Sequence, residues 1–265
     1  MAALDELTTQ NSQLKTTRAV TAIIPALNEA DAIAEVVRGV RDAGVADVIV
    51  VDNGSDDDTA TRAAAAGARV IREPRRGYGR ACRAGVQAVP GGTATVLFLD
   101  GDGSDDPRDI PGLVAPIAAG THDFVIGSRT RGAREPGSLH ASQLLAGRLA
   151  GLAMRWLYGV PYTDMCPLRA IRADALAALG MREETYGWNL EMQMRVAQAG
   201  LRILEMPVRH RHRRGGRSKV SGSVTGSLRA AGRLASTLVR LALASPSRTR
   251  PASGRRERAR GTDRV

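Results

Sequence analysis

Two aspartates, Asp100 and Asp102, stand one residue apart at the end of the apolar run Val96 to Leu99. An apolar run between turn-forming segments is typical of a central strand in a parallel sheet, and such sheets bind ligands at the carboxyl ends of their strands. Adjacent carboxylates repel each other unless a cation lies between them, so this spacing suits Mg²⁺ or Mn²⁺ bridging to a phosphate. A solvated, aspartate-rich turn is the alternative interpretation.

The elements that would position these aspartates alternate along the first half of the chain. The sequence predicts strands at 20–24, 47–51 and 69–71 and helices at 29–43, 57–66 and 79–88. Strands separated by helices of this length indicate right-handed βαβ units, and hence an α/β fold with a mostly parallel central sheet flanked by helices. The first turn, residues 25–29, lacks the glycine-rich fingerprint of dinucleotide-binding dehydrogenases.

Polar residues also follow the second predicted strand. Asp52 can accept hydrogen bonds from a base edge or a ribose, and residues 53–55 form a turn before the next helix. The loops 25–29, 52–55 and 100–104 all follow parallel strands, so they should meet at one edge of the sheet. Each loop alone is an ordinary turn or helix cap, but their recurrence at successive strand ends predicts one ligand crevice.

Composition restricts the class of protein. The chain has 265 residues, of which 43% are apolar, enough for one large core or two modest ones. It has no apolar run near the roughly 18 residues of a membrane span and no apolar leader segment, so a cytoplasmic location is expected. The segment 246–265 is rich in Ser, Pro and Arg, and we expect a disordered tail there that contacts anionic lipid or nucleic acid nonspecifically.

The net charge of +11 is carried almost wholly by arginine, with lysine only at Lys15 and Lys219. Arginine suits bidentate phosphate recognition. A specific nucleic-acid-binding function is not expected, because only 3% of residues are aromatic and the acidic strand ends would repel a nucleic-acid backbone.

An ordered series of motifs carries a resemblance to a known family. The motifs are I-I-P-A-L-N-E at 23–29, V-V-D-N-G-S-D-D-D-T at 50–59, L-D-G-D at 99–102, G-S-R at 127–129, Y-T-D-M-C-P-L-R-A-I-R at 162–172, Y-G-W-N-L-E-M-Q-M-R at 186–195, L-E-M-P-V at 204–208 and R-R-G-G-R-S-K-V-S-G at 213–222. Over about residues 20–230 the chain resembles the family 2 glycosyltransferases of GT-A fold, in the branch that contains dolichyl-phosphate mannose synthase.

The resemblance implies a donor site. The residues implied to hold the nucleotide are Pro25, Ala26, Asn28, Glu29, Asp52, Asn53 and Gly54. Asp100, Gly101 and Asp102 would form the D-x-D motif, whose two aspartates bind the metal that holds the sugar nucleotide diphosphate. Ser104 stands where many relatives have a glutamine that helps to bind the metal, and Asn53 replaces a common aspartate.

The resemblance also implies groups near the acceptor. The residues implied to bind donor or acceptor phosphates are Arg129, Arg148, Arg214, Arg217, Ser218 and Lys219, with Lys219 assisting catalysis. Glu191 is the candidate general base and Asp164 a second candidate, which a turn explains equally well. Trp188 would stack on a sugar face or lie in the core.

The activity so implied is a metal-dependent, inverting transfer of a hexose from a UDP- or GDP-sugar to an acceptor, for which polyprenyl phosphate is favoured. The alternatives are transfer to a soluble hydroxyl with Glu191 as base, or a sugar nucleotidyltransferase, which should carry a glycine-rich basic loop after the first strand. The domain would span residues 19–245, between an N-terminal extension, 1–18, and the tail. Its amphipathic helix at about 224–244 would lie on a membrane, pack on the domain or join a homodimer.

Overall fold

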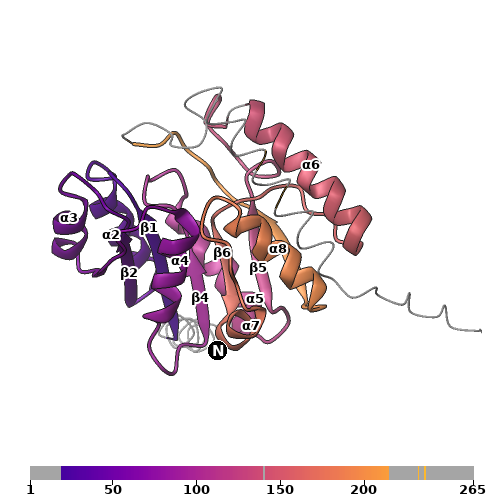
Figure 1. The fold of residues 1–265 in the computed structure, drawn as a ribbon, viewed down its shortest axis with the longest axis horizontal. Coiled ribbons are helices and arrows are strands. Elements are labelled where there is room, and N and C mark those ends of the chain that lie inside the picture. Colours follow the sequence, from indigo (N-terminus) through magenta and orange to yellow (C-terminus); the bar gives the residue numbers. More distant parts are fainter. Residues whose placement is uncertain (1–18, 140, 215–231, 233–235, 237–265) are drawn as a thin grey trace, which may run out of the picture.

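The structure of the chain, a computed structural model, describes residues 19–139, 141–214, 232 and 236 (Figure 1). The expected N-terminal extension and C-terminal tail therefore lie outside the described residues, as do Arg217, Ser218 and Lys219. Of the expected amphipathic helix at 224–244, only residues 232 and 236 are described. The predictions made for these segments stay predictions.

The α/β fold predicted from the sequence is confirmed. The strands are β1 (Val20–Ala26), β2 (Asp47–Asp52), β3 (Arg69–Arg72), β4 (Thr95–Phe98), β5 (Phe124–Ser128), β6 (Arg169–Arg172) and β7 (Ile203–Pro207). They form one seven-stranded sheet in the order β3-β2-β1-β4-β6-β5-β7. All described pairings are parallel except those of β6, which runs antiparallel to both β4 and β5.

The helices follow the predicted alternation. They are α2 (Ile33–Asp42), α3 (Thr59–Ala65), α4 (Tyr78–Gln87), the 3₁₀ helix η1 (Pro107–Asp109), α5 (Ile110–Ala118), α6 (Ala141–Tyr158), α7 (Ala173–Leu179) and α8 (Trp188–Gln198). Helix α2 begins later than predicted because residues 29–32 form a separate turn, in which the Glu29 carbonyl accepts hydrogen bonds from the amides of Ala32 and Ile33.

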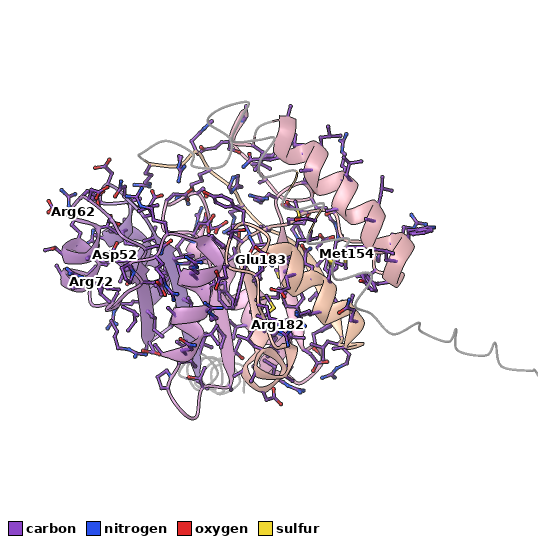
Figure 2. The ribbon with its side chains drawn as sticks, viewed as in Figure 1. Asp52, Arg62, Arg72, Met154, Arg182 and Glu183 are labelled. Carbon is purple, nitrogen blue, oxygen red and sulfur yellow. The ribbon has the colours of Figure 1, made fainter. Side chains whose placement is uncertain are left out.

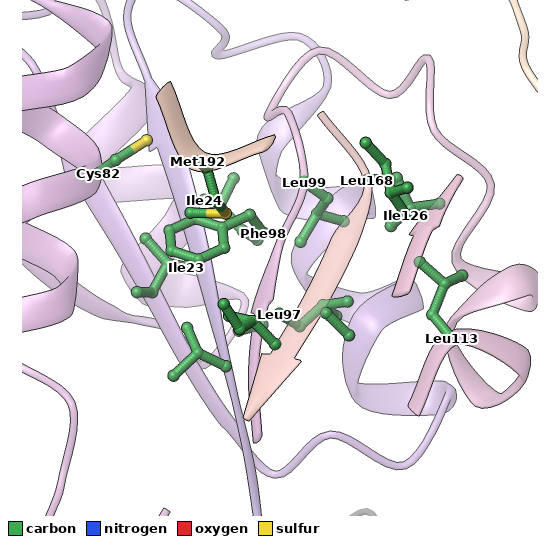
Figure 3. Close-up of a cluster of buried hydrophobic side chains, with 14 of the residues drawn as sticks. Ile23, Ile24, Cys82, Leu97, Phe98, Leu99, Leu113, Ile126, Leu168 and Met192 are labelled. Carbon is green, nitrogen blue, oxygen red and sulfur yellow. The ribbon is translucent and has the colours of Figure 1, made fainter. Parts of the chain in front are cut away.

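The core lies on both faces of the sheet. Strand β1 is buried at every position, which is expected of a central strand covered on two sides. Figure 3 shows part of this core, where Ile23, Phe98 and Met192 pack together and Leu113 of α5 faces Ile126. Helix α4 packs on β1 and β2, whereas α5 packs on β4, β5 and β6.

The reversed strand β6 has a consequence for the site. Because β6 is antiparallel to its neighbours, its amino end lies at the same edge of the sheet as the carboxyl ends of β1, β2, β4, β5 and β7. Residues just before β6 therefore join those that follow the other strands. The structure brings Asp164 to Arg129 in this way, although the two lie 35 residues apart in sequence.

Candidate active site

A cavity of about 400 Å³ opens at this edge of the sheet. Loops after β1, β2, β4 and β7 contribute to its wall, together with the starts of α4 and α6. The residues that line it are Pro25, Ala26, Leu27, Glu29, Asn53, Arg76, Gly77, Tyr78, Ala81, Asp100, Gly101, Asp102, Gln143, Tyr186 and Arg213. The convergence of three strand-end loops on one crevice, predicted from the sequence, is what the structure shows.

The loop after β1 is tied to the loop after β2. The Asn28 amide donates to the Ser55 hydroxyl at 2.9 Å, and the Asn28 side-chain oxygen accepts from the Asp56 amide at 2.9 Å. Asn28 has a φ of 53°, a conformation that asparagine adopts more readily than most residues. Asn28 thus positions the two loops, while Pro25, Ala26 and Glu29 face the cavity.

The side chains of Asp52 and Asn53 form hydrogen bonds to the backbone of the neighbouring loops. The Asp52 carboxylate accepts the Ser55 amide at 3.0 Å and so closes the turn. The Asn53 side chain donates to the carbonyls of Glu73 and Arg75, each at 2.9 Å, and accepts the Gly77 amide at 2.7 Å. Asn53 therefore lines the cavity while holding the loop that carries Arg76 and Gly77. Gly54, with a φ of 82°, completes the turn.

Three carboxylates gather after β4. Asp100 accepts the Tyr78 hydroxyl at 3.2 Å, and its amide donates to Asp105 at 3.2 Å. Asp102 accepts the Ser104 amide at 2.9 Å, and its second oxygen lies 3.0 Å from a guanidinium nitrogen of Arg213. Burial, then repulsion from Asp102, raises the pKa of Asp100 to about 7. Burial, then repulsion from Asp100, raises the pKa of Asp105 to about 8.

These groups fit a divalent cation. One oxygen of Asp105 is buried and accepts no hydrogen bond from any described residue, and the pKa values of Asp100 and Asp105 are raised by burial and by the neighbouring carboxylates. Within the described ranges, no three acidic, His or Cys side chains are arranged as a ready metal cage. Mg²⁺ needs only one or two carboxylates when substrate phosphates and water supply its other ligands. Asp100 and Asp102 are therefore the candidate protein ligands.

His210 adds a nitrogen beside the carboxylates. Its backbone forms an isolated β-bridge with Asp105, and the residue is only 5% exposed. Burial, then the nearby charge of Arg129, lowers the pKa of His210 to about 4, so the imidazole is neutral. Its Nδ1 makes no hydrogen bond to a described residue. A neutral imidazole is a metal ligand as well as a proton acceptor.

Arg213 links the two acidic sides of the cavity. One of its nitrogens lies 3.1 Å from Glu29 and 3.0 Å from Asp102. The same segment brings Arg214, whose amide donates to the Asp102 carbonyl at 3.0 Å and whose guanidinium pairs with Glu35. The structure thus places Arg213, rather than the predicted Arg214, in the cavity wall.

Arg129 and Asp164 form a largely buried ion pair at the same edge of the sheet. Two guanidinium nitrogens of Arg129 donate to Asp164 at 2.8 and 2.7 Å, and the Arg129 amide donates to it at 2.9 Å. Burial opposes ionisation of Asp164, but the hydrogen bonds from Arg129 hold its pKa below the usual value. Neither residue is among those that line the cavity. Both carboxylate oxygens of Asp164 accept hydrogen bonds from Arg129, so the structure does not support Asp164 as a base facing the cavity.

Two further predicted site residues point away from the cavity. Glu191 is fully buried and accepts hydrogen bonds from the amides of Arg182 at 3.0 Å and Glu183 at 2.6 Å, and from Arg195 at 2.9 Å. A carboxylate so engaged does not face an acceptor, so the structure gives the base assignment no support. Trp188 is also buried and lies against Phe98 with ring centroids 6.4 Å apart, so it is a core residue.

The remaining predicted arginine, Arg148, lies exposed on α6 and does not line the cavity. Sequence reasoning missed Tyr78, Gln143, Tyr186 and Arg213, all of which do. Two of them stood in quoted motifs: Arg213 opens the basic motif 213–222, and Tyr186 opens the motif 186–195. Tyr78 and Gln143 reach the site from the starts of α4 and α6, and Tyr186 from the loop before α8, so their positions depend on tertiary packing.

The loop before α8 is held against the start of α4 through a glycine. The Gly79 amide donates to the Thr185 carbonyl at 3.2 Å, and a Cβ at Gly79 would lie 2.1 Å from the Glu183 carbonyl oxygen. Alanine favours a helix by up to about 1 kcal/mol, but overpacking costs about 1–3 kcal/mol. We expect Gly79→Ala to lower the free energy of unfolding by about 1–2 kcal/mol in urea titrations.

A matched control is Gly91→Ala, because nothing lies within 4 Å of a Cβ at that position. It should leave the urea midpoint unchanged. Equal midpoints for the two variants would show that the loop before α8 does not pack on α4 as described.

Comparisons with known proteins agree with this geometry. The family model described as glycosyl transferase family 2 matches residues 21–180. An uncharacterized glycosyltransferase of Mycobacterium tuberculosis is 42% identical over 214 residues, covering 79% of this chain and 93% of that protein. An undecaprenyl-phosphate mannosyltransferase of Micrococcus luteus is 34% identical over 223 residues, covering 78% of this chain and 89% of that protein.

Among solved structures, glucosyl-3-phosphoglycerate synthase of Mycobacterium tuberculosis has a similar fold. Its crystal structure with Mn²⁺, uridine-diphosphate-glucose and phosphoglyceric acid has a TM-score of 0.72 and 24% identity, covering 89% of this chain and 84% of that chain. At this identity the likeness concerns the GT-A fold alone.

Proposed function

This chain belongs to glycosyl transferase family 2, and from that premise we propose that it transfers a hexose from a UDP- or GDP-sugar in a reaction that requires Mg²⁺ or Mn²⁺. The observation that carries the proposal is the buried acidic cluster after β4, with Asp100 and Asp102 in the cavity wall. The Mn²⁺ and UDP-glucose bound by a protein of the same fold support this choice of ligands.

The parts of the cavity take distinct roles in this proposal. The loops that carry Pro25, Ala26 and Asn53 would hold the nucleoside, and Asp100 and Asp102 would hold the cation. The cation, when bound, would neutralise charge on the leaving nucleoside diphosphate. Arg213 is the described cation closest to Asp102, and it would exchange Glu29 and Asp102 for phosphate oxygens when the donor binds. Lys219, outside the described residues, would add a second positive charge.

We propose a polyprenyl phosphate as the acceptor. The name of the Micrococcus luteus relative, at 34% identity, supports it. The second support is the placement of Glu191, because an acceptor that is already ionised needs no base, and the predicted base does not face the cavity. Direct attack of the phosphate on the anomeric carbon would invert its configuration.

Access to such an acceptor would be peripheral, at the inner face of the membrane. Within the described ranges, none of the helices has the length and apolar character that crossing a bilayer requires. A homodimer remains a prediction that no described contact addresses.

A donor screen tests the proposal. Thermal unfolding is measured with each of a set of UDP- and GDP-sugars, with and without Mn²⁺. We expect one nucleotide series to raise the melting temperature only when Mn²⁺ is present, because cation and diphosphate share the site. Stabilisation that is equal without Mn²⁺, or none by any nucleotide sugar, would contradict the proposed donor site.

Glu191→Gln separates a base from a structural anchor. The substitution removes a charge opposite Arg195, whose side chain is 21% exposed, so we expect a loss of about 1–3 kcal/mol in the free energy of unfolding. The rate of transfer to polyprenyl phosphate at saturating substrate should stay near that of the wild type.

Arg195→Gln is the matched control, since it breaks the same ion pair and keeps the carboxylate. If Glu191→Gln lowers the rate by about 10² or more while Arg195→Gln does not, Glu191 is a general base. A soluble hydroxyl acceptor would then replace the lipid phosphate.

A further inference from the structure

Helix α6 carries an apolar stripe on its outer face. Leu145, Leu149 and Leu152 are 59%, 58% and 63% exposed, and Trp156 is 86% exposed. At 100° per residue these four positions fall within about 60° of arc, in a line about 16 Å long. Leu and Trp of this exposure, aligned on one helix, form a continuous surface and not scattered apolar residues.

The opposite face of α6 explains why this stripe stays outside. Gly151 packs so closely that a Cβ there would lie 2.1 Å from the Tyr162 carbonyl oxygen, and Met154 is buried. Helix α6 also contacts α8 (Figure 1). The small-residue face is therefore committed to the domain, and the Leu and Trp side chains have no place in the core.

Charge selects the kind of partner that would cover the stripe. Arg148 and Arg155 are exposed and follow Leu145 and Leu152 at three-residue spacing, so they lie beside the stripe. The sequence of α6 contains no acidic residue. A second copy of α6 packed on the stripe would bring like charges together.

The chain's own segment 215–245 is equally unsuited to cover the stripe, since it has five Lys and Arg residues and no Asp or Glu. An anionic membrane surface offers an apolar layer for the stripe and negative charge for the arginines. Apolar side chains enter the boundary between headgroups and acyl chains, and arginines contact lipid phosphates.

The position of α6 connects this surface to the cavity. Gln143, near the start of the helix, lines the cavity, and the stripe begins two residues later at Leu145. We propose that the α6 stripe, Leu145, Leu149, Leu152 and Trp156 with Arg148 and Arg155, docks the protein on an anionic phospholipid surface beside the cavity mouth. This docking surface would bring the cavity to a lipid-linked phosphate acceptor, and in that respect the inference rests on the proposed function.

Vesicle co-sedimentation of the full chain tests the proposal. Phosphatidylcholine vesicles with and without phosphatidylglycerol are compared for the wild type and for Leu149→Ser/Leu152→Ser/Trp156→Ser. We expect binding to vesicles that contain phosphatidylglycerol, and a decrease of about tenfold or more in the partition coefficient of the triple variant. These side chains are exposed, so the urea midpoint of the variant should match that of the wild type.

Charge variants provide a matched pair. Arg148→Gln/Arg155→Gln should weaken binding about fivefold for each charge removed, since an arginine near an anionic surface contributes about 1 kcal/mol. Arg38→Gln/Arg72→Gln removes two exposed arginines at the far end of the molecule, where Figure 2 shows Arg72 remote from Met154 of α6. That pair should bind vesicles as the wild type does.

Several results would overturn the inference. They are no binding of the wild type to anionic vesicles, equal binding of the triple variant, or a dimer that the triple substitution dissociates in light scattering. A triple variant that is markedly less stable to urea would show that a segment of the chain covers the stripe. Donor binding and transfer are measured separately, so that failure of the docking surface can be told apart from failure of the proposed acceptor. If vesicle binding depends on the stripe but no polyprenyl phosphate is glycosylated, the acceptor assignment fails and the docking surface stands.

Discussion

Asp102→Asn is expected to abolish transfer and Mn²⁺-dependent nucleotide binding while the protein stays folded. The Asp102 carboxylate lies in the cavity wall, 3.0 Å from Arg213, and with Asp100 it is the candidate ligand set for the cation. Loss of one of two carboxylate ligands removes several kcal/mol of charge stabilisation at the leaving diphosphate, which corresponds to about 10³-fold or more in rate.

The measurement is calorimetric titration of UDP and GDP with and without Mn²⁺, followed by a transfer assay. Asp31→Asn is the charge control, because it removes one exposed carboxylate with no change in the acidic cluster. The control should bind and transfer as the wild type does. Unchanged Mn²⁺-dependent nucleotide binding by folded Asp102→Asn would remove Asp102 from the metal site.

The second expectation is that the metal-free protein loses stability as the pH rises from about 6.5 to 8.5. The pKa of Asp100 is raised to about 7 by burial first and by repulsion from Asp102 second, and that of Asp105 to about 8 by burial first and by repulsion from Asp100 and Asp102 second. In the unfolded chain both groups are already ionised at pH 6.5, so the folded state binds more protons there. The free energy of unfolding therefore falls with rising pH, by about 2 kcal/mol over this window.

The window begins at pH 6.5 because of His210, whose pKa is lowered to about 4 in the folded protein. Below the unfolded pKa of about 6.5, this group makes the free energy of unfolding decrease as the pH falls, which would oppose the effect of the two aspartates. Urea titrations at pH 6.5, 7.5 and 8.5 should show the decline for the wild type. Asp105→Asn should flatten it by removing one of the two raised groups. Saturating Mn²⁺ with nucleotide should flatten it as well, because a bound cation favours the ionised carboxylates and lowers their pKa values. A metal-free protein equally stable across the window would show that the cluster is not buried as described.

The edge of the sheet that holds the site could be predicted from sequence because parallel strands follow a simple rule. Apolar runs ending in polar residues indicated where β1, β2 and β4 stop, and the fold requires those ends to meet. Strand β6 was not predictable in this way. It is four residues long and carries arginine at both ends, so nothing in its pattern indicates its direction.

The direction in which each side chain of α8 points could not be predicted from the spacing of its apolar and polar residues. Almost every residue from Trp188 to Ala197 is buried, so the helix has no polar face against which an inward carboxylate could be recognised. Glu191 stood in a motif typical of the family, but its direction depends on the loop amides of Arg182 and Glu183. Tyr186 reaches the cavity through the same loop, which is why its motif gave no indication of that contact.

The most direct test of the proposed function is transfer of radiolabelled hexose to polyprenyl phosphate in detergent, with Mn²⁺ and the nucleotide sugar identified by thermal unfolding. The account predicts a labelled lipid product that forms with the wild type, is absent with Asp102→Asn and disappears when the cation is chelated. A labelled lipid that forms equally with chelator present, or transfer only to a soluble hydroxyl compound, would contradict it.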